Sequence, residues 1–423
     1  MTREPEQTPA RPVSTWSGIV IAIVAIFGAL YIVSQFLRNS VGVIAPDLAA
    51  EVDLSPMQIG LLSSMYFFVF AATQLPLGVA LDRFGPKLCI LVSLAFAVIG
   101  CAVFALAHSA SGLVAGRALL GFGTACFLMA PMALYARWFP PARFSTFAGI
   151  HFGIGSLGAL FATAPLAFAT ATIGWRATFL AVGAASMVIG ILIWLIVSDD
   201  PPGVKSAPRR ETLREGVAGI WQVMRTPSMG RIFLVQLTTY PSLLLVVGLW
   251  GGPYLTHIYG YDLKGRGDIL FWATLAQILG SFFWGPMDQL LGRHKVPILI
   301  GVGICFTALM LLATLGTLPG PVLIAAFVML GFSTGMSSIV MAHGRSLVPP
   351  HLLGRCITLL NIGTMGGGFL VQFVSGAIID LFPVSAAGGY PLEAYRLVFG
   401  LQAALVLIGA WAYFGSRERH LAR

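Results

Sequence analysis

Long apolar runs alternate with short polar connections along almost the whole chain. A helix that crosses a bilayer needs about 20 consecutive, mostly apolar residues. Runs of this kind lie at residues 17–45, 57–80, 88–107, 112–137, 145–170, 177–198, 232–254, 268–290, 296–318, 322–346, 356–381 and 395–414. The pattern therefore predicts an all-α membrane protein with twelve transmembrane helices.

Composition agrees with this pattern and excludes several classes of protein. Of the 423 residues, 57% are hydrophobic and only 10% are charged, whereas a soluble domain carries about a quarter charged residues. The five cysteines lie in or beside apolar runs and form no CxxC pair, so we expect neither a disulfide framework nor a metal site. Because the spans contain no clustered histidines or acids for catalysis, we expect no enzyme and no cofactor.

The basic residues indicate the topology. If the N-terminus is cytoplasmic, most of the 25 lysines and arginines fall in inner loops. The outer loops then hold only Arg176, Lys264, Arg266 and Arg396. By the positive-inside rule, both termini are predicted in the cytoplasm of a multi-pass bacterial inner-membrane protein. The net charge of +9 therefore does not indicate binding to nucleic acid.

One long polar stretch, residues 199–231, divides the chain into two parts. The predicted organisation is a cytoplasmic tail at 1–16, a six-helix bundle at 17–198, the cytoplasmic linker, a second bundle at 232–414 and a tail at 415–423. Within the linker, residues 211–224 have helical apolar spacing, which favours an amphipathic helix on the inner membrane surface. We expect a monomer surrounded by lipid.

The two predicted bundles share short sequence patterns. The loop after the second span matches the loop after the eighth, Gly285 to Lys295, and Leu120-Gly121-Phe122 matches Leu330-Gly331-Phe332 at a nearly constant offset. Several unrelated matches at one offset indicate an internal repeat. Two similar halves are expected to pack around a site at the membrane midplane and to rock against one another.

Two motifs carry a resemblance to a known family. The first loop reads Gly78-x-x-x-Asp82-Arg83-x-Gly85-x-Lys87. The fourth span contains Gly116-Arg117-x-x-x-Gly121-x-Gly123. They resemble the signature loop and the fourth-helix motif of the major facilitator superfamily. The resemblance implies two pseudo-symmetric six-helix bundles and transport by alternating access.

The resemblance also implies which residues form the inner gate. In the family, the aspartate at the position of Asp82 pairs with cytoplasmic side chains and helix ends. The implied gate residues are Gly78, Asp82, Arg83, Gly85 and Lys87, with a weaker second copy at Asp288 and Arg293. The alternative is a plain solvated turn.

Arg38 is the strongest candidate for a substrate ligand. An arginine well inside a span costs about 2.5–3.5 kcal/mol on insertion scales, so it should face the protein interior or a wet cavity. Its guanidinium can bind a carboxylate through two parallel hydrogen bonds. The run Arg38-x-Ser40-Val41-x-x-x-Ala45-Pro46 resembles the first helix of organic-anion symporters of the superfamily. Alternatively, Arg38 snorkels to the outer interface.

Other polar residues in the spans are weaker candidates. Gln35, Tyr66, Gln236, Tyr240, Gln277 and Asn361 could complete a substrate cavity. In the family, the arginine at the position of Arg117 supports helix packing or proton coupling. His151 could carry a coupling proton, because histidine titrates near neutral pH, or could be a buried structural residue.

These features predict a secondary active transporter. We expect it to move a small anionic organic solute, a carboxylate, across the inner membrane by alternating access with coupling to protons. The alternatives are efflux of drugs or metabolites by proton antiport, and amino-acid or metallophore transport. Drug efflux is less favoured because no acid lies deep in a span and because Gly149-x-x-x-Gly153, the start of the antiporter motif, is followed by Ile154 instead of proline.

Overall fold

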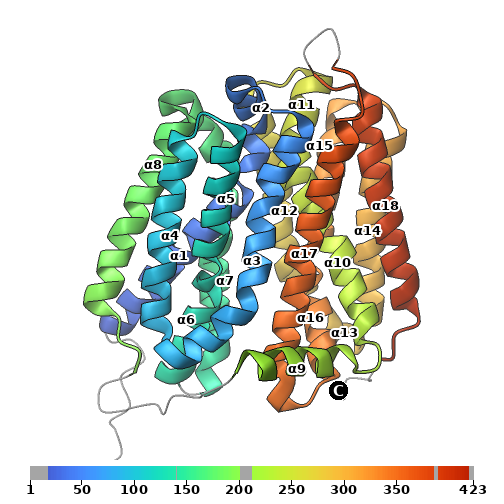
Figure 1. The fold of residues 1–423 in the computed structure, drawn as a ribbon. Coiled ribbons are helices and arrows are strands. Elements are labelled where there is room, and N and C mark those ends of the chain that lie inside the picture. Colours follow the sequence, from blue (N-terminus) through green and yellow to red (C-terminus); the bar gives the residue numbers. More distant parts are fainter. Residues whose placement is uncertain (1–17, 140, 201–211, 385–388, 419–423) are drawn as a thin grey trace, which may run out of the picture.

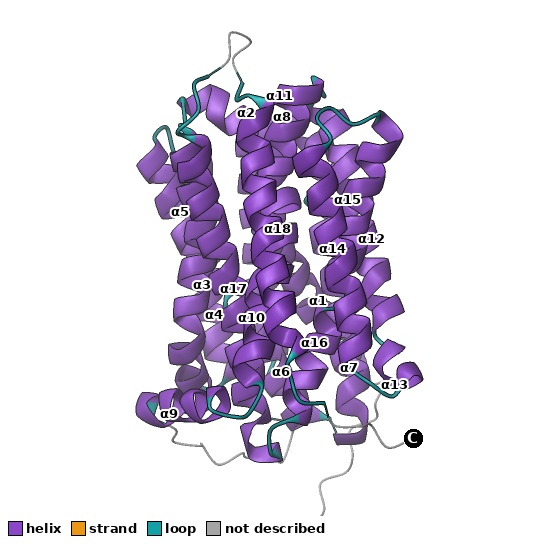
Figure 2. Ribbon diagram, turned by 90° about the vertical axis from the view of Figure 1, so that its right-hand side faces the viewer, coloured by secondary structure: helices purple, strands orange, loops and turns teal. Residues whose placement is uncertain are grey.

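The computed structural model describes residues 18–139, 141–200, 212–384 and 389–418. Every regular element in these ranges is a helix, and no strand occurs among them (Figures 1 and 2). The predicted tail at 1–16, residues 201–211 of the linker, and the end of the predicted C-terminal tail lie outside the described residues.

The helices of the first half of the chain stand side by side (Figure 1). They are α1 Gly18–Asn39, α2 Val41–Val52, α3 Pro56–Phe84, α4 Pro86–Leu106, α5 Ala110–Thr124, α6 Cys126–Trp138, α7 Pro141–Phe161 and α8 Ala164–Ile196. In the linker, α9 Leu213–Met224 lies across one end of the bundle. Following the predicted topology, we call that end the inner end and the end that carries α2 the outer end.

The second half repeats this arrangement. It consists of α10 Met229–Leu245, the π-helix η1 Val246–Trp250, α11 Gly251–Tyr259, α12 Leu263–Trp284, α13 Met287–Leu291, α14 Lys295–Thr314, α15 Gly320–Thr334, α16 Ser337–Ser346, the short 3₁₀-helix η2 Pro350–Leu352, α17 Leu353–Ile379 and α18 Leu392–Phe414.

Ten helices, some of them continuous pairs, are long and apolar enough to span a membrane within the described chain. The predicted fifth and eighth spans correspond to α7 and α12, which fall outside this set. The described apolar part of α7 is short, Thr146–Phe161, and α12 carries Lys264, Arg266 and Asp268 near its start. Both nevertheless pack inside the bundle, α7 against α1 and α12 against α15. Together these helices account for the twelve predicted spans.

Several predicted boundaries were wrong. The predicted span 17–45 is interrupted at Ser40, between α1 and α2. The predicted span 145–170 ends at Phe161, and α8 begins at Ala164 and bends at Gly174, which has a φ of 79°. Glycine adopts this left-handed conformation without the steric penalty that a side chain would add. Hydrophobicity alone does not register such backbone changes.

The repeat is visible in matching contacts at the inner end of each half. The carboxylate of Asp199, which follows α8, accepts a hydrogen bond of 2.7 Å from the backbone N–H of Lys87 in the first turn of α4. The carboxylate of Glu418, which follows α18, accepts one of 2.9 Å from the backbone N–H of Lys295 in the first turn of α14. An acid at a helix N-terminus accepts hydrogen bonds from the free N–H groups there and interacts favourably with the positive end of the helix dipole.

Matching contacts also hold the outer ends of α4 and α14. Arg176 of α8 donates hydrogen bonds of 2.6 and 2.7 Å to the carbonyl oxygens of Ala105 and Ala107. Arg396 of α18 donates to the carbonyl oxygens of Ala313 and Thr314, at 2.6 and 3.0 Å. The third span of each half is thus bound at both ends by residues on or next to the sixth span.

Candidate substrate site

Arg38 lies at the centre of the candidate site, in the last turn of α1. Its side chain is only 7% exposed. The guanidinium carbon lies 5.0 Å from the centre of the Phe70 ring, and Tyr31, Tyr66 and Tyr240 lie close enough to interact with it electrostatically. This burial argues against a side chain that snorkels to the outer interface.

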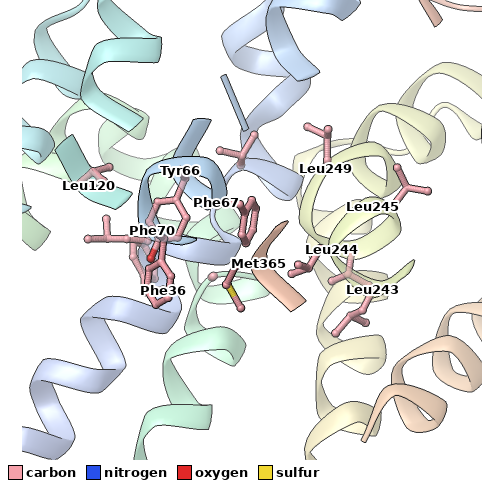
Figure 3. Packing of buried hydrophobic residues seen from close by; sticks show 14 of the residues in the cluster. Phe36, Tyr66, Phe67, Phe70, Leu120, Leu243, Leu244, Leu245, Leu249 and Met365 are labelled. Carbon is pink, nitrogen blue, oxygen red and sulfur yellow. The ribbon is translucent and has the colours of Figure 1, made fainter. Parts of the chain in front are cut away.

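The neighbours of Arg38 come from both halves of the chain. Tyr31 precedes it on α1, Tyr66 and Phe70 belong to α3, and Tyr240 belongs to α10. Figure 3 shows Tyr66 and Phe70 beside Phe36 of α1, with Met365 between this group and Leu243, Leu244 and Leu245 of α10. Polar groups around Arg38 are therefore enclosed by apolar side chains at the contact between the halves.

Arg117 is a second buried guanidinium close to the first. It is fully buried, and its Nη1 donates a 2.6 Å hydrogen bond to the carbonyl oxygen of Leu37, the residue before Arg38. Its guanidinium carbon lies 4.6 Å from the centre of the Tyr66 ring. The Tyr66 hydroxyl forms a 2.6 Å hydrogen bond with Thr124 Oγ1. Arg117 thus fixes the end of α1 and the Tyr66 ring.

Neither arginine has an acidic partner in the described part of the chain. The ion pairs found there join Arg137 to Asp200, Arg176 to Glu51 and Arg266 to Asp47, and the Asp288 carboxylate lies beside His294. Arg38 Nε and two guanidinium nitrogens of Arg117 are buried and lack hydrogen-bond partners. Buried charges are normally paired or solvated. The site therefore carries positive charge that an anion could neutralise.

Amide side chains complete the polar surroundings. Gln35 Nε2 donates a 3.0 Å hydrogen bond to the Tyr31 hydroxyl. Gln277 Nε2 of α12 donates to the Tyr240 hydroxyl at 3.4 Å. Of the residues that the sequence predicted, Arg38, Gln35, Tyr66, Tyr240 and Gln277 are thus linked through direct contacts or shared neighbours.

One predicted ligand bonds elsewhere, another makes no hydrogen bond among the described residues, and one neighbour was missed. Gln236 is buried in the second half, where its Nε2 donates to Ser337 Oγ and Thr364 Oγ1, both at 2.7 Å. Asn361 is partly buried and makes no side-chain hydrogen bond within the described chain. Tyr31 was not predicted, although residues 31, 35 and 38 share one helical face.

His151 of α7 contacts this group through Tyr31. The two rings stack with centres 4.7 Å apart and planes inclined by 15°. His151 Nδ1 lies 3.5 Å from the Tyr135 hydroxyl, whereas Nε2 is buried and finds no hydrogen-bond partner in the described part of the chain. The imidazole is completely buried.

The two halves touch closely at the outer end. Arg266 of α12 is buried and forms an ion pair with Asp47 of α2, and its Nε donates a 2.8 Å hydrogen bond to the carbonyl oxygen of Val43. A Cβ atom on Gly42 would collide with the carbonyl oxygen of Val247. These contacts join the two halves at the outer end.

Some of the predicted inner-gate residues make polar or packing contacts with other helices, and others make none. Asp82 makes no hydrogen bond or ion pair within the described chain, and Arg83 lies over the ring of Phe84. Gly85 has a φ of 82° and packs against the Asp199 carboxylate, while Lys87 Nζ donates to the carbonyl oxygen of Trp194 at 2.8 Å. A Cβ on Gly78 would meet no atom within 4 Å.

The second copy of the loop is held differently. Asp288 Oδ2 lies 3.2 Å from His294 Nδ1, and its Oδ1 accepts a hydrogen bond from the backbone N–H of Gln289. Arg293 contributes only its backbone N–H, which donates to the carbonyl oxygen of Asp288. No cluster of three or more potential metal ligands occurs among the described residues.

Comparisons with known proteins agree with the fold and the motifs. The family model described as Major Facilitator Superfamily matches residues 27–267, more than half of the chain. The chain belongs to the major facilitator superfamily. It is therefore a membrane transporter and not an enzyme.

Similar proteins include transporters of anions. The hexuronate transporter of Escherichia coli K12 is 25% identical over 89% of this chain and 90% of its own length. The nitrate/nitrite transporter NrtP of Picosynechococcus is 28% identical, but the match spans only 38% of this chain and 35% of that relative. A solved bacterial homologue of the human lysosomal transporter Spinster shares the fold, with a TM-score of 0.74, 16% identity, and coverage of 94% and 97% of the two chains.

Proposed function

We propose that this transporter carries a small hydroxylated carboxylate, such as a sugar acid, into the cytoplasm together with a proton. The observation that carries the proposal is Arg38, which is buried at the contact between the halves and has no acidic partner among the described residues. We further propose a monomer in a bacterial inner membrane with both termini in the cytoplasm.

The chemistry of the site supports an anionic substrate. A carboxylate can accept two parallel hydrogen bonds from one guanidinium, and such charge-assisted bonds are stronger than neutral ones. The hydroxyls of Tyr31 and Tyr240 and the amides of Gln35 and Gln277 can bond the hydroxyl groups of the substrate. The relative named as a hexuronate transporter carries a substrate of this class.

Alternating access is supported by the unequal contacts at the two ends. The outer end is closed by the Arg266–Asp47 ion pair, whereas Asp82 has no partner at the inner end in the described chain. We infer that the substrate leaves toward the cytoplasm from this conformation. Pairing of Asp82 would then accompany closure of the inner end.

The alternative, efflux of cationic drugs, receives less support. A cavity for cations commonly contains an acid that holds their charge. Here the two buried charges beside Phe70 and Tyr66 are Arg38 and Arg117, and neither pairs with an acid within the described residues.

The proposal is tested by uptake into proteoliposomes. The panel contains sugar acids, simple mono- and dicarboxylates, nitrate, amino acids and cationic dyes, each with and without an inward proton gradient. We expect a sugar acid to accumulate with the gradient. Arg38→Lys keeps one positive charge but loses the paired geometry, so we expect uptake to fall by about 10- to 100-fold, in line with the 1.5–3 kcal/mol of a charged hydrogen bond.

Two further variants make this result specific. Arg38→Ala should abolish uptake, while Arg225→Ala, which removes an exposed arginine next to α9, should leave it unchanged. Transport of dyes alone, or normal uptake by Arg38→Ala, would refute an anion site at Arg38.

A further inference from the structure

Proton coupling requires a group that exchanges a proton near neutral pH, and none of the described residues around Arg38 is an acid. The side chains around Arg38 are phenols and amides. A phenol has an ordinary pKa of about 10, so it stays protonated at neutral pH. Among the described residues that make ring or hydrogen-bond contacts with Tyr31, Tyr66 or Tyr240, only His151 is of a type whose ordinary pKa lies near neutrality.

We propose that His151 is the residue that takes up the coupling proton, and that the anion bound at Arg38 enables this protonation. The inference rests on the proposed function. It adds to that function the residue that carries the proton and the dependence of its protonation on the bound anion. It assigns to His151 the coupling role in place of a purely structural one.

The geometry connects the two groups through Tyr31. One face of the Tyr31 ring stacks on His151. Its hydroxyl is held by Gln35 at 3.0 Å and interacts with Arg38 electrostatically. The substrate site and the imidazole are therefore separated by one aromatic ring.

The hydrogen bonding of His151 leaves one nitrogen available. Nε2 is buried and has no hydrogen-bond partner among the described residues, whereas Nδ1 lies 3.5 Å from the Tyr135 hydroxyl. A proton can therefore add to the lone pair of whichever ring nitrogen lacks one. Afterwards it leaves the same nitrogen to water on the inner side, and no other bond is made or broken.

The charges around His151 explain why protonation and anion binding favour one another. Tyr31 and Arg38 come from α1 and Tyr135 comes from α6. The other helices packed on α7, α8 and α12, place no titratable side chain against the imidazole within the described chain. In the empty site, a protonated His151 would add a positive charge to those of Arg38 and Arg117.

A bound carboxylate changes this balance. It neutralises the charge of Arg38, so the imidazolium is repelled less and becomes easier to form. By thermodynamic linkage, the proton must then tighten anion binding by the same factor. One proton per monovalent carboxylate makes the cycle electrically neutral, so an imposed membrane potential should not change its rate.

The test compares His151→Gln with wild type in three assays. Glutamine keeps hydrogen-bonding groups of similar size but does not titrate. We expect His151→Gln to bind the carboxylate and to exchange it in counterflow, which needs no gradient. It should not accumulate the carboxylate in response to a proton gradient. Its Kd should also stay constant with pH, whereas the wild-type Kd should rise by up to tenfold per pH unit above the pKa of the histidine.

His343→Gln is the matched control. His343 is also completely buried, but it bonds Tyr413 in the second half, away from the candidate site. It should retain gradient-driven accumulation. If His151→Gln accumulates substrate as wild type does, the assignment is wrong while the proposed function stands. If wild type transports no carboxylate, the proposed function itself fails.

A measurement on the unmodified protein covers the case in which the variant does not fold. Purified transporter in weakly buffered detergent is mixed with the carboxylate, and a pH-indicator dye reports proton uptake. We expect up to one proton taken up per anion bound, with none for Arg38→Ala. Binding without proton uptake between pH 5.5 and 8 would overturn the proposal.

Discussion

At the scale of single residues, the two buried arginines have different tasks. Arg38 has a guanidinium nitrogen without a hydrogen-bond partner in the described chain, and the hydroxyls of three tyrosines lie near it. Arg117 instead donates to the Leu37 carbonyl and lies over the Tyr66 ring. We therefore assign substrate binding to Arg38 and positioning of α1 and Tyr66 to Arg117.

This assignment makes a prediction for Arg117→Lys. Lysine keeps the charge, but it lacks the planar guanidinium that donates to Leu37 while it lies over Tyr66. We expect the apparent KM for the carboxylate to rise about tenfold or more, matching the 1.5–3 kcal/mol of a charged hydrogen bond. Uptake kinetics at several substrate concentrations measure this effect.

Tyr66→Phe provides the comparison for this variant. It keeps the ring under Arg117 but removes the hydroxyl that bonds Thr124. A smaller rise in KM is expected, because the ring and the Arg117–Leu37 hydrogen bond both remain. A KM for Arg117→Lys equal to that of wild type would contradict a positioning role.

Sequence reasoning located the centre of the site better than its periphery. Arg38 could be predicted because a charge inside a span is costly wherever it lies. Gln236 could not be separated from Gln277 in this way, because both are amides within apolar runs. The rotation of a helix about its axis decides which of its faces meets the partner half. Hydrophobicity hardly specifies this rotation here, because the helices are apolar on most faces.

At the scale of elements, the repeat consists of contacts as well as sequence motifs. Asp199 and Glu418 bind the first turns of α4 and α14, and Arg176 and Arg396 bind their last turns. Neither acid belongs to the loop motif, so the motif comparison did not reveal them. These contacts hold the third span of each half against the sixth.

Removing one such contact should lower stability. Asp199→Ala deprives the backbone N–H of Lys87 of its acceptor, and losing an N-terminal cap costs about 0.5–2 kcal/mol. We expect a lower Tm in detergent, measured by thermal unfolding. Asp82→Ala is the control. Asp82 is an acid at the same inner end, but it has no partner in the described chain, so the Tm of this variant should match that of wild type. Equal Tm values for Asp199→Ala and wild type would show that the contact does not stabilise α4.

The number and order of the spans followed from the sequence, but their ends did not. Apolar length sets the count, because a bilayer imposes it on every span. The interruption at Ser40 and the bend at Gly174 arise inside apolar sequence, from backbone angles. Arg266 was placed in an outer loop, yet it lies in α12 and is buried because Asp47 and the Val43 carbonyl are its partners.

At the scale of the whole molecule, the outer end is held closed by contacts between the halves. Two acids of α2 make this testable, because they lie one helical turn apart and have different partners. Asp47 pairs with Arg266 of the second half, whereas Glu51 pairs with Arg176 of the first half. Burial acts to raise the pKa of Glu51, but hydrogen bonds from Trp175 and Arg176 outweigh it and lower the pKa. Glu51 is thus charged at neutral pH.

Asp47→Asn should therefore open the outer end, and Glu51→Gln should not. A buried reporter, Ser64→Cys, lies one helical turn after Gly60, which packs against Gly376 of α17, and would react with a water-soluble maleimide only after opening. Weakening a charged hydrogen bond by 1.5–3 kcal/mol shifts the conformational equilibrium by about 10- to 100-fold, so labelling of the Asp47→Asn protein should accelerate by up to that factor. Similar rates in both variants would mean that the backbone contacts at Gly42, and not the ion pair, determine closure.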